Sequence, residues 1–449
     1  MMPLPDGLKR HCNKPFSPSR VPFFYGWVIL AAGIIGVLMS IPGQTMGVSV
    51  FTENLLEDLA INRNSLSLAY LVGTTLSGLL ITRAGKLYDR YGARIMAFVS
   101  GVLLGVMLLY LTRVDRIAGA LAGVNCFSPG IITFALLSLG FFGIRFFGQG
   151  MLTMVSRNMV MKWFDKRRGM ANAVLGIFTA MGFAIAPKLL NSIIVQLQWR
   201  GAWIFMALVV GIVFALFVLA IFRDNPRDCG LEADGKMEAR RRKNRPPSLP
   251  DHDFSLGEAR RSRAFWAFTM ALAISTLYIS GFTFHIVSVF ESSGLTRAKG
   301  LAIFIPTSVI AVVIQFICSY ISDFVKLKYL LILFMAGMLL TTFGLTNLGG
   351  MDGAYWLIVT GNGMVWGLYT VLIGVTWPRF YGLKNLGAIS GASLSWTVIG
   401  SALGPYMFSL SFQWTGHYDL VGWICFAVST GLLFLGFRAD NPSVNTMVR

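Results

Sequence analysis

A short charged stretch, Gly85-Lys86-Leu87-Tyr88-Asp89-Arg90-Tyr91-Gly92-Ala93-Arg94, lies between two apolar runs, Ser65–Thr82 and Ile95–Thr112. Each run is about 18 residues long, which is enough for a helix to cross ~30 Å of hydrocarbon. The two glycines permit a tight reversal of the chain, and the charged side chains require water or an ion partner. We therefore expect this stretch to be the aqueous loop between two membrane-spanning helices.

The rest of the sequence repeats this pattern of long apolar runs separated by short polar loops. Of the 449 residues, 55% are hydrophobic and 13% are charged, and the mean hydropathy is +0.66. Soluble domains have roughly 45–50% apolar and ~25% charged residues, so a water-soluble protein is excluded. An outer-membrane barrel is excluded as well, because its strands alternate over ~10 residues. We predict an all-α membrane protein with twelve spans, with approximate bounds 24–47, 65–82, 95–112, 131–161, 169–196, 199–222, 264–290, 298–322, 329–346, 353–377, 385–412 and 417–437.

The positive charges lie mostly on one side of these predicted spans. The formal net charge is +18, from 38 Lys and Arg against 20 Asp and Glu. With a cytoplasmic N-terminus, the outer side, counting the outer ends of the spans, holds only six: Arg63, Arg113, Arg116, Arg200, Arg297 and Lys299. This bias is the positive-inside rule, which predicts an even number of spans with both termini in the cytoplasm. The charge therefore sets the topology, and nucleic acid is excluded as a partner.

The spans form two sets of six that resemble each other. The longest polar stretch, 223–263, contains four basic residues at 240–243 and predicts a basic cytoplasmic linker. Gly169 in the fifth span returns 218 residues later as Gly387 in the eleventh. Two parallel six-helix repeats place a binding site near the membrane midplane, which points to transport. The predicted parts are a cytoplasmic N-terminal tail (1–23), an N-terminal six-helix half (24–222), the linker (223–263), a C-terminal six-helix half (264–437) and a cytoplasmic C-terminal tail (438–449).

The stretch 85–94 resembles the loop 2–3 signature of the major facilitator superfamily. The motif residues at the expected spacings are Gly85, Leu87, Asp89, Arg90, Gly92 and Arg94. The resemblance implies two pseudo-symmetric six-helix halves that work by rocker-switch alternating access. It also implies that Asp89 caps a helix N-terminus of the opposite half, and that these residues hold the outward-facing state. In the second half the motif is reduced to Ser319-Tyr320-Ile321-Ser322-Asp323, in which Asp323 is the remaining gating candidate.

The first span resembles that of the oxalate/formate and monocarboxylate porters of this superfamily. Tyr25-Gly26-Trp27 stands at its start and Gly47-Val48-Ser49-Val50-Phe51 at its end, and Asn62-Arg63-Asn64-Ser65 leads into the second span. Those porters carry charges inside span eight, and the oxalate porter also carries a lysine in span eleven. Here 298–322 has no interior charge beyond Lys299, and 385–412 has none. The anion site of that branch therefore does not transfer to this chain.

Arg145 and Lys188 are the only Lys or Arg that we place in the interior of a predicted span, away from its ends, and no Asp or Glu lies near the middle of one. Charges at this depth are costly and usually face a cavity. Two cations without an acidic partner predict a site for an anion, and a guanidinium binds carboxylate through two hydrogen bonds. The run Arg145…Gly148-Gln149-Gly150 also loosely resembles the span-four motif of the superfamily, in which Arg is tied to proton coupling. A structural role through backbone carbonyls is the alternative for Arg145, and snorkelling to water is the alternative for Lys188.

Uncharged groups at mid-depth complete the candidate substrate-binding set. His285 in span seven can titrate and carry protons, although a hydrogen-bonded packing histidine is the commoner case. The other candidates share an amide or aromatic group that can line a pocket or bridge two helices: Gln149, Tyr278, Gln315, Asn362, Trp366, Tyr369 and Trp396.

The combined expectation is a secondary active transporter of a small organic anion, such as a mono- or dicarboxylate, by proton symport or anion exchange. We expect no cofactor and no enzymatic activity, with the lipid bilayer, an anionic substrate and protons as partners. We also expect a monomer in a plasma membrane, in the first place a bacterial inner membrane. The alternatives are a drug/proton antiporter, which would normally keep an acidic residue in the membrane, and a non-transporting sensor of the same fold.

Overall fold

The computed structural model describes residues 13–59, 61, 63–122, 128–234 and 252–442. Throughout these ranges every regular element is helical. The basic run at 240–243, most of the N-terminal tail and the end of the C-terminal tail lie outside the described residues, so the predictions on them are not addressed. By their contacts, the residues group into two compact units, 1–165 with 177–246 and 166–176 with 247–449.

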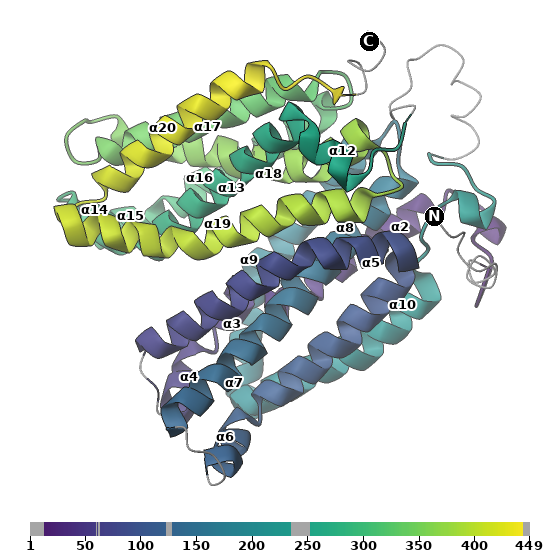
Figure 1. Cartoon of the computed structure of the whole chain (residues 1–449), viewed down its shortest axis with the longest axis horizontal. Coiled ribbons are helices and arrows are strands. Elements are labelled where there is room, and N and C mark those ends of the chain that lie inside the picture. Colours follow the sequence, from purple (N-terminus) through teal and green to yellow (C-terminus); the bar gives the residue numbers. More distant parts are fainter. Residues whose placement is uncertain (1–12, 60, 62, 123–127, 235–251, 443–449) are drawn as a thin grey trace. The chain divides into compact units, whose positions relative to one another are not determined.

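The first unit contains the helices of the N-terminal part of the chain (Figure 1). Its elements are η1 (Pro18–Arg20), α2 (Gly26–Leu38), η2 (Ile41–Gly43), α3 (Thr45–Ser49), α4 (Thr52–Leu59), α5 (Arg63–Leu111), α6 (Val114–Ala122), α7 (Pro129–Ile144), the π-helical η3 (Arg145–Leu152), α8 (Thr153–Trp163), most of α9 (Arg168–Leu208), the π-helical η4 (Val209–Phe214), α10 (Ala215–Ile221) and η5 (Arg227–Cys229). Within this unit α5 packs against α7, and α2 packs against α8.

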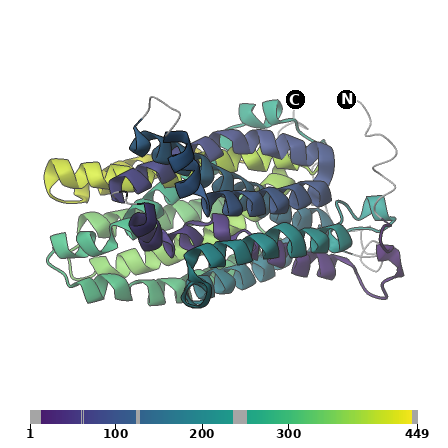
Figure 2. The same ribbon diagram turned by 90° about the horizontal axis from the view of Figure 1, so that it is seen from below.

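The second unit contains the start of α9 and the C-terminal helices. These are α12 (Leu256–Arg261), α13 (Arg263–Phe284), α14 (Ile286–Ser292), α15 (Arg297–Ala302), α16 (Phe304–Ile321), α17 (Leu327–Thr346), α18 (Ala354–Tyr381), α19 (Leu386–Thr415) and α20 (Asp419–Phe437). Here α13 packs against α19, and α18 packs against both α16 and α17. Seen from below, the long helices of each unit run alongside one another (Figure 2).

Ten helical segments among the described residues are long and apolar enough to cross a membrane. Two of them, Ser65–Leu111 and Arg168–Ile221, have 47 and 54 residues, which is enough for two crossings each. Each also contains one residue outside helical geometry: Gly92 with φ 83° and Gln198 with φ 60°. The ten segments therefore provide the twelve predicted crossings, in an all-helical membrane fold.

The predicted loop 85–94 is mostly helical. The backbone of α5 continues through Gly85 as far as Tyr91, and only Gly92 adopts the positive φ that a glycine favours. The second span is thus longer than its apolar run, because the helix satisfies its own backbone hydrogen bonds after the side chains have become polar. The expectation that two glycines form the turn was wrong for Gly85.

The first span also differs from the prediction. The apolar run 24–47 is divided into α2, η2 and α3, with Gln44 in an extended conformation (φ −84°, ψ 154°). Pro42 has no N–H to donate and Gly43 disfavours helix, so an uninterrupted helix is opposed by the sequence itself. This break brings freed backbone groups to membrane depth, where they need partners from the protein.

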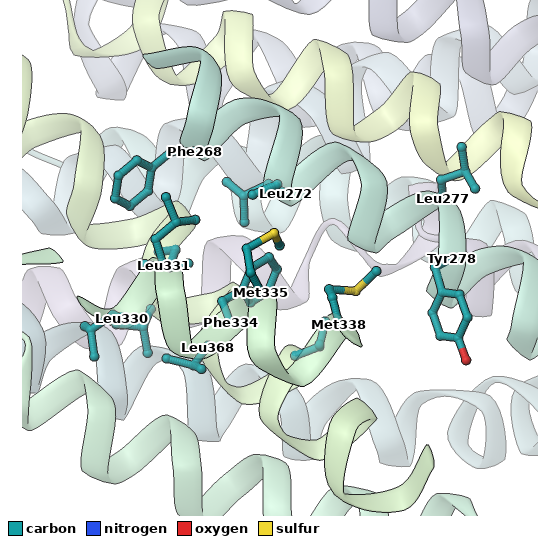
Figure 3. Packing of buried hydrophobic residues seen from close by; sticks show 14 of the residues in the cluster. Phe268, Leu272, Leu277, Tyr278, Leu330, Leu331, Phe334, Met335, Met338 and Leu368 are labelled. Carbon is teal, nitrogen blue, oxygen red and sulfur yellow. The ribbon is translucent and has the colours of Figure 1, made fainter. Parts of the chain in front are cut away.

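Large apolar side chains fill the interior of the second unit and also cover the outside of both units. Phe268 and Leu272 of α13 pack with Leu331 and Met335 of α17 in a buried cluster (Figure 3). Outside, Val195 of the first unit is 78% exposed and Ile305 and Phe284 of the second are 74% and 68% exposed, among many others. Such faces suit a lipid environment, in which helices associate by packing and small-residue contacts.

Candidate functional site

Arg145 lies beside the break in the first span. It starts the π-helical turn η3, and its side chain is 1% exposed. Its Nη1 donates to the carbonyl oxygen of Gly43 and to the Oγ1 of Thr45, both at 3.2 Å. The guanidinium also lies over the ring of Tyr70, 5.2 Å from its centre, and the Tyr70 hydroxyl donates to the same Thr45 Oγ1 at 3.0 Å. Arg145 therefore donates hydrogen bonds to backbone and hydroxyl groups that have no partner within the broken helix.

The glycine at the break permits this close approach. A methyl group on Gly43 would lie 2.1 Å from the carbonyl oxygen of Ile144 and 3.0 Å from the backbone nitrogen of Gln149. The first and fourth spans thus meet backbone to backbone at Gly43. π-helical turns such as η3 occur often at functional sites, since the extra residue redirects side chains.

A hydroxyl and amide cluster continues from Arg145 along the fourth span. The Thr153 hydroxyl donates to the Oγ of Ser40 at 3.1 Å, and the Nε2 of Gln44 donates to the same Oγ at 3.0 Å and to Thr153 Oγ1 at 3.3 Å. The Oε1 of Gln149 is buried without a hydrogen-bond partner. We call Ser40, Gln44, Thr45, Tyr70, Arg145, Gln149 and Thr153 the break cluster.

The charge of Arg145 is not balanced by an acid. No carboxylate among the residues that the structure describes lies within 4.0 Å of its guanidinium, and its Nε is buried without a partner. A buried cation with one carbonyl, one hydroxyl and one aromatic face as partners keeps unused capacity for an anion. The break cluster is therefore the best candidate site of the first unit.

The sequence prediction found Arg145 and Gln149 but missed the other five members of this cluster. Four of the five are neutral polar residues that occur in any membrane helix, and the fifth is a tyrosine, so their identity alone gave no signal. The pair Pro42-Gly43 inside an apolar run did contain one, because this dipeptide marks a turn. A break there predicts that nearby polar side chains are needed to pair the backbone.

Lys188 is not brought to Arg145 by any contact. It lies on α9 with an exposed side chain, and Arg145 is buried within the first unit. A common anion site for the two cations therefore stays a prediction.

Three binding candidates of the second unit, Tyr278, Asn362 and His285, form hydrogen bonds with neighbouring helices inside the unit. The Tyr278 hydroxyl lies 3.0 Å from the Oγ1 of Thr341, and the Thr341 hydroxyl donates to the Oδ1 of Asn362 at 3.0 Å. These hydrogen bonds join α13, α17 and α18. Figure 3 shows Tyr278 at one end of the side chains drawn from the buried cluster. His285 Nε2 lies 3.0 Å from the carbonyl oxygen of Pro405, with its ring parallel to that of Phe408. These are the contacts of the packing alternative, and ligand contact by the three candidates stays a prediction.

Trp366 and Tyr369 of α18 are half-buried. The Trp366 ring stacks on Phe304 at 6.3 Å, and its Nε1 is buried without a hydrogen-bond partner. An indole N–H without a partner can donate to a ligand. Of these two residues, Trp366 is therefore the one with an unpaired hydrogen-bond donor that a ligand could use.

Asp323, the remnant of the second motif, caps the start of α9. Its Oδ1 accepts from the backbone N–H of Gly169 at 3.0 Å, within the second unit. Arg379 donates to the backbone oxygens of Ser322 and Asp323, which holds the turn in place. Burial raises the pKa of Asp323 to about 6, although Gly169, Arg379 and Arg168 favour the carboxylate. The Asp323 carboxyl therefore releases its proton at a higher pH than an exposed aspartate does.

The turn at Gly92 is held by an acid that the sequence prediction did not select. Asp224 follows the sixth span, and its Oδ1 accepts from the backbone N–H of Arg94 at 2.9 Å. Burial raises the pKa of Asp224, against the effect of the backbone N–H groups. A methyl group on Gly92 would lie 2.5 Å from this carboxylate, so the position has no room for a side chain. Arg94 in turn donates to the carbonyl oxygen of Leu219.

Within the first unit, α6 has a defined contact with the start of the predicted sixth span. Arg200 donates to Asp58 of α4 and, at 2.9 Å, to the Oδ2 of Asp115 of α6. Trp199 Nε1 donates to Asp58 at 2.8 Å, and this hydrogen bond and Arg200 lower the pKa of that carboxyl. The segment between the predicted third and fourth spans thus supplies an ion partner, Asp115, to Arg200 of the sixth span.

Comparison with known proteins places the chain in a family. The sequence profile described as Major Facilitator Superfamily matches residues 30–405. The L-fucose-proton symporter of Haemophilus influenzae is 30% identical over 120 residues, 27% of either chain. The hexuronate transporter of Bacillus subtilis is 23% identical over 223 residues, 49% of this chain and 46% of that protein. The chain thus matches less than half the length of these relatives.

Two solved structures share the fold. A double-Trp mutant of XylE superimposes with a TM-score of 0.62 at 16% identity, covering 92% of this chain and 96% of that chain. The human organic anion transporter MFSD10 gives a TM-score of 0.57 at 14% identity, covering 94% and 100%. At these identities the likeness concerns the fold alone. With the profile matched over most of its length, and ten helices among the described residues that are long and apolar enough to cross a membrane, the chain belongs to the Major Facilitator Superfamily.

Proposed function

We propose that this protein is a secondary active transporter of a small organic anion, driven by proton symport or anion exchange. The observation that supports the anion is Arg145, a buried cation with no carboxylate within 4.0 Å among the described residues and with an unpaired Nε. A substrate carboxylate would supply the missing charge and pair with the guanidinium through two hydrogen bonds. Mono- and dicarboxylates fit this requirement, as the resemblance of the first span to the monocarboxylate and oxalate/formate porters implies.

The relatives extend the proposal to sugar acids. The Bacillus subtilis relative is named a hexuronate transporter, and a hexuronate is both a carboxylate and a sugar. The Haemophilus influenzae relative is named for L-fucose and protons, which supports a second candidate, a neutral sugar moved with a proton. The two candidates differ in one chemical group, the carboxylate.

Alternating access needs contacts that open and close at the cytoplasmic side. We propose Asp323 for this role in the second repeat, since it caps the start of α9. Asp89, with Gly85, Arg90, Gly92 and Arg94, is proposed for the corresponding role in the first repeat. We further propose a monomer in a plasma membrane with both termini in the cytoplasm.

A thermal-stability screen of the detergent-purified protein tests the substrate class. The screen compares glucuronate with glucose and galacturonate with galactose, and adds fucose, small mono- and dicarboxylates and lipophilic cations. A ligand at ~100 times its Kd adds about 2.7 kcal/mol to the stability of the folded state. We expect stabilisation by one or more carboxylates and by none of the parent sugars.

Two variants make the screen specific for the site. Arg145→Gln should lose the response to the carboxylate. Arg223→Gln is the matched control, because Arg223 is also 1% exposed and also donates to backbone oxygens, those of Ala220, Phe222 and Phe16. Equal stabilisation by uronates and parent sugars would support the neutral sugar instead, and an unchanged response of Arg145→Gln would contradict the anion site.

A further inference from the structure

The first turns of α9 present three residues on one face. Gly169, Asn172 and Gly176 are spaced by three and four positions, which aligns them along a helix. All three group with the second unit, and the rest of the helix from Ile177 groups with the first. The contacts of this face therefore decide where the start of α9 is held.

At the first level, the backbone of α9 meets the backbone of α16. A methyl group on Gly169 would lie 2.0 Å from the carbonyl oxygen of Ser319. The Asp323 carboxylate closes this level by accepting from the Gly169 N–H at 3.0 Å. Only a glycine permits helices to approach this closely.

At the second level, the side chain of Asn172 occupies a notch in α18. Asn172 is 1% exposed, and its Nδ2 donates to the carbonyl oxygen of Thr370 at 3.0 Å. A methyl group on Gly374 would lie 2.1 Å from the Oδ1 of Asn172, and the three nearest atoms all belong to that side chain. The notch at Gly374 is thus filled by this one carboxamide.

At the third level, Gln315 of α16 fills the space over Gly176. A methyl group on Gly176 would lie 1.8 Å from the Nε2 of Gln315, which is 4% exposed. On its other side, Gln315 faces α18, where a methyl group on Gly367 would lie 3.0 Å from the Gln315 backbone nitrogen. The start of α9, α16 and α18 are therefore fitted together through glycines and two carboxamides.

The start of α9 is complementary in shape to α16 and α18, but the hydrogen bonding of this contact is incomplete. The Oδ1 of Asn172 and the Nε2 of Gln315 are buried without a hydrogen-bond partner among the residues described. Buried polar atoms are nearly always paired, and an unpaired one disfavours the arrangement that buries it. A contact of this kind is specific in position but easily released.

We propose that Asn172 and Gln315 are positioning residues of a releasable interlock that holds the start of α9 against α16 and α18. Release of this interlock opens the cytoplasmic side during the transport cycle. Its part in transport rests on the proposed function, whereas the interlock itself is independent of the substrate. The glycines set the geometry, the Asn172 hydrogen bond keeps the register, and the two unpaired atoms keep the contact weak.

Hydrogen exchange of the peptide that contains 168–176, measured by mass spectrometry on the full-length protein in detergent, reports on docking. Gly374→Ala displaces the Asn172 carboxamide, and we expect at least tenfold faster exchange. Adding Asn172→Ala removes the displaced group, so the double variant should exchange within threefold of the wild type. Gln315→Leu removes an unpaired donor at similar volume, and we expect at least threefold slower exchange.

Gly337→Ala is the matched control for a methyl group added within the second unit. Its nearest atoms belong to Met364, Gly361 and Val365 of α18, away from α9. The interlock is contradicted if Gly374→Ala exchanges like Gly337→Ala, or if the double variant is no slower than Gly374→Ala. If Gln315→Leu exchanges faster than the wild type, the claim that the unpaired atoms weaken the contact is overturned.

Uptake of glucuronate by proteoliposomes tests the role in transport separately. We expect Gln315→Leu to lower kcat at least threefold with little change in KM, since docking would be harder to release. Unchanged kcat in a variant whose exchange is slowed would overturn the role in transport and leave the proposed function standing. Absence of glucuronate uptake by the wild type would count against the proposed function, and the exchange data would still decide the interlock.

Discussion

Gly43 and Arg145 occupy the point at which the first and fourth spans meet. The glycine lets the two backbones approach, and the arginine pairs the carbonyl that the break exposes. An unpaired carbonyl inside a membrane costs several kcal/mol, so the break is stable only with such a partner. A role in structure and a role in binding are compatible here, because the Nε remains unpaired.

Gly43→Ala tests the backbone contact at residue scale. Its methyl group would meet backbone atoms of Ile144 and Gly148 that cannot rotate away. We expect a loss of about 1–3 kcal/mol, seen as a fall of a few °C in the unfolding temperature in detergent. Gly431→Ala, in the membrane helix α20 with nothing within 4 Å of the added methyl group, should cost nothing measurable. Equal effects of the two substitutions would show that the close contact at Gly43 is not formed.

At the scale of elements, α9 is the helix whose first turns and remaining turns group with different units. Its start is held by Asp323, whose pKa is raised to about 6 by burial. A carboxyl whose pKa is raised on docking favours the docked state when it is protonated. Docking of the start of α9 is therefore most favourable below pH 3.8, the usual pKa of an aspartate, where Asp323 is protonated in both the docked and the released state. Docking weakens as the pH rises from 3.8 to about 6, because the released state ionises first, and it is constant at higher pH, where Asp323 is ionised in both states.

Hydrogen exchange at 168–176 should therefore depend on pH. After correction for intrinsic rates, we expect less protection at pH 7 than at pH 5 in the wild type. Asp323→Asn cannot ionise and should show the same protection at both values. A pH effect of equal size in Asp323→Asn would show that another group controls the docking of α9.

The sequence predicts crossings well and helix ends poorly. Twelve apolar runs were enough for the crossings, because a chain inside the membrane must pair its backbone polar groups within the protein, which a helix does. The reversal at Gly92 depends instead on Asp224, which accepts from the Arg94 N–H and follows 130 residues later in the chain. Local composition contains no information on such a partner. The break at Pro42-Gly43 is the exception, since its own dipeptide opposes a helix.

For the candidate site, the sequence predicted the charged residue but not the neutral polar residues around it. Arg145 stands out because few ionisable residues lie at membrane depth. Ser40, Gln44 and Thr153 do not, as hydroxyl and amide groups are common in membrane helices and acquire a role only when packing brings them together. The same holds for Asn172 and Gln315, of which only Gln315 was a candidate at the sequence level.

At the scale of the whole molecule, the family and the fold support the proposed transport, and the buried cation Arg145 supports an anion as its substrate. No Asp or Glu lies near the middle of a span, so a cationic substrate would find no acidic partner there. The chain matches less than half of its curated relatives in length, and their substrates are therefore hypotheses for this protein.

The most direct test is the flux of glucuronate and of glucose into proteoliposomes that contain only this protein, with Arg145→Gln and Arg223→Gln measured in parallel. We predict uptake of glucuronate and not of glucose, driven by an inward proton gradient or by exchange with internal glucuronate. Arg145→Gln should lower kcat/KM at least a hundredfold, which corresponds to about 2.7 kcal/mol, and Arg223→Gln less than tenfold. Glucose uptake equal to that of glucuronate, or glucuronate uptake that survives Arg145→Gln, would contradict the account.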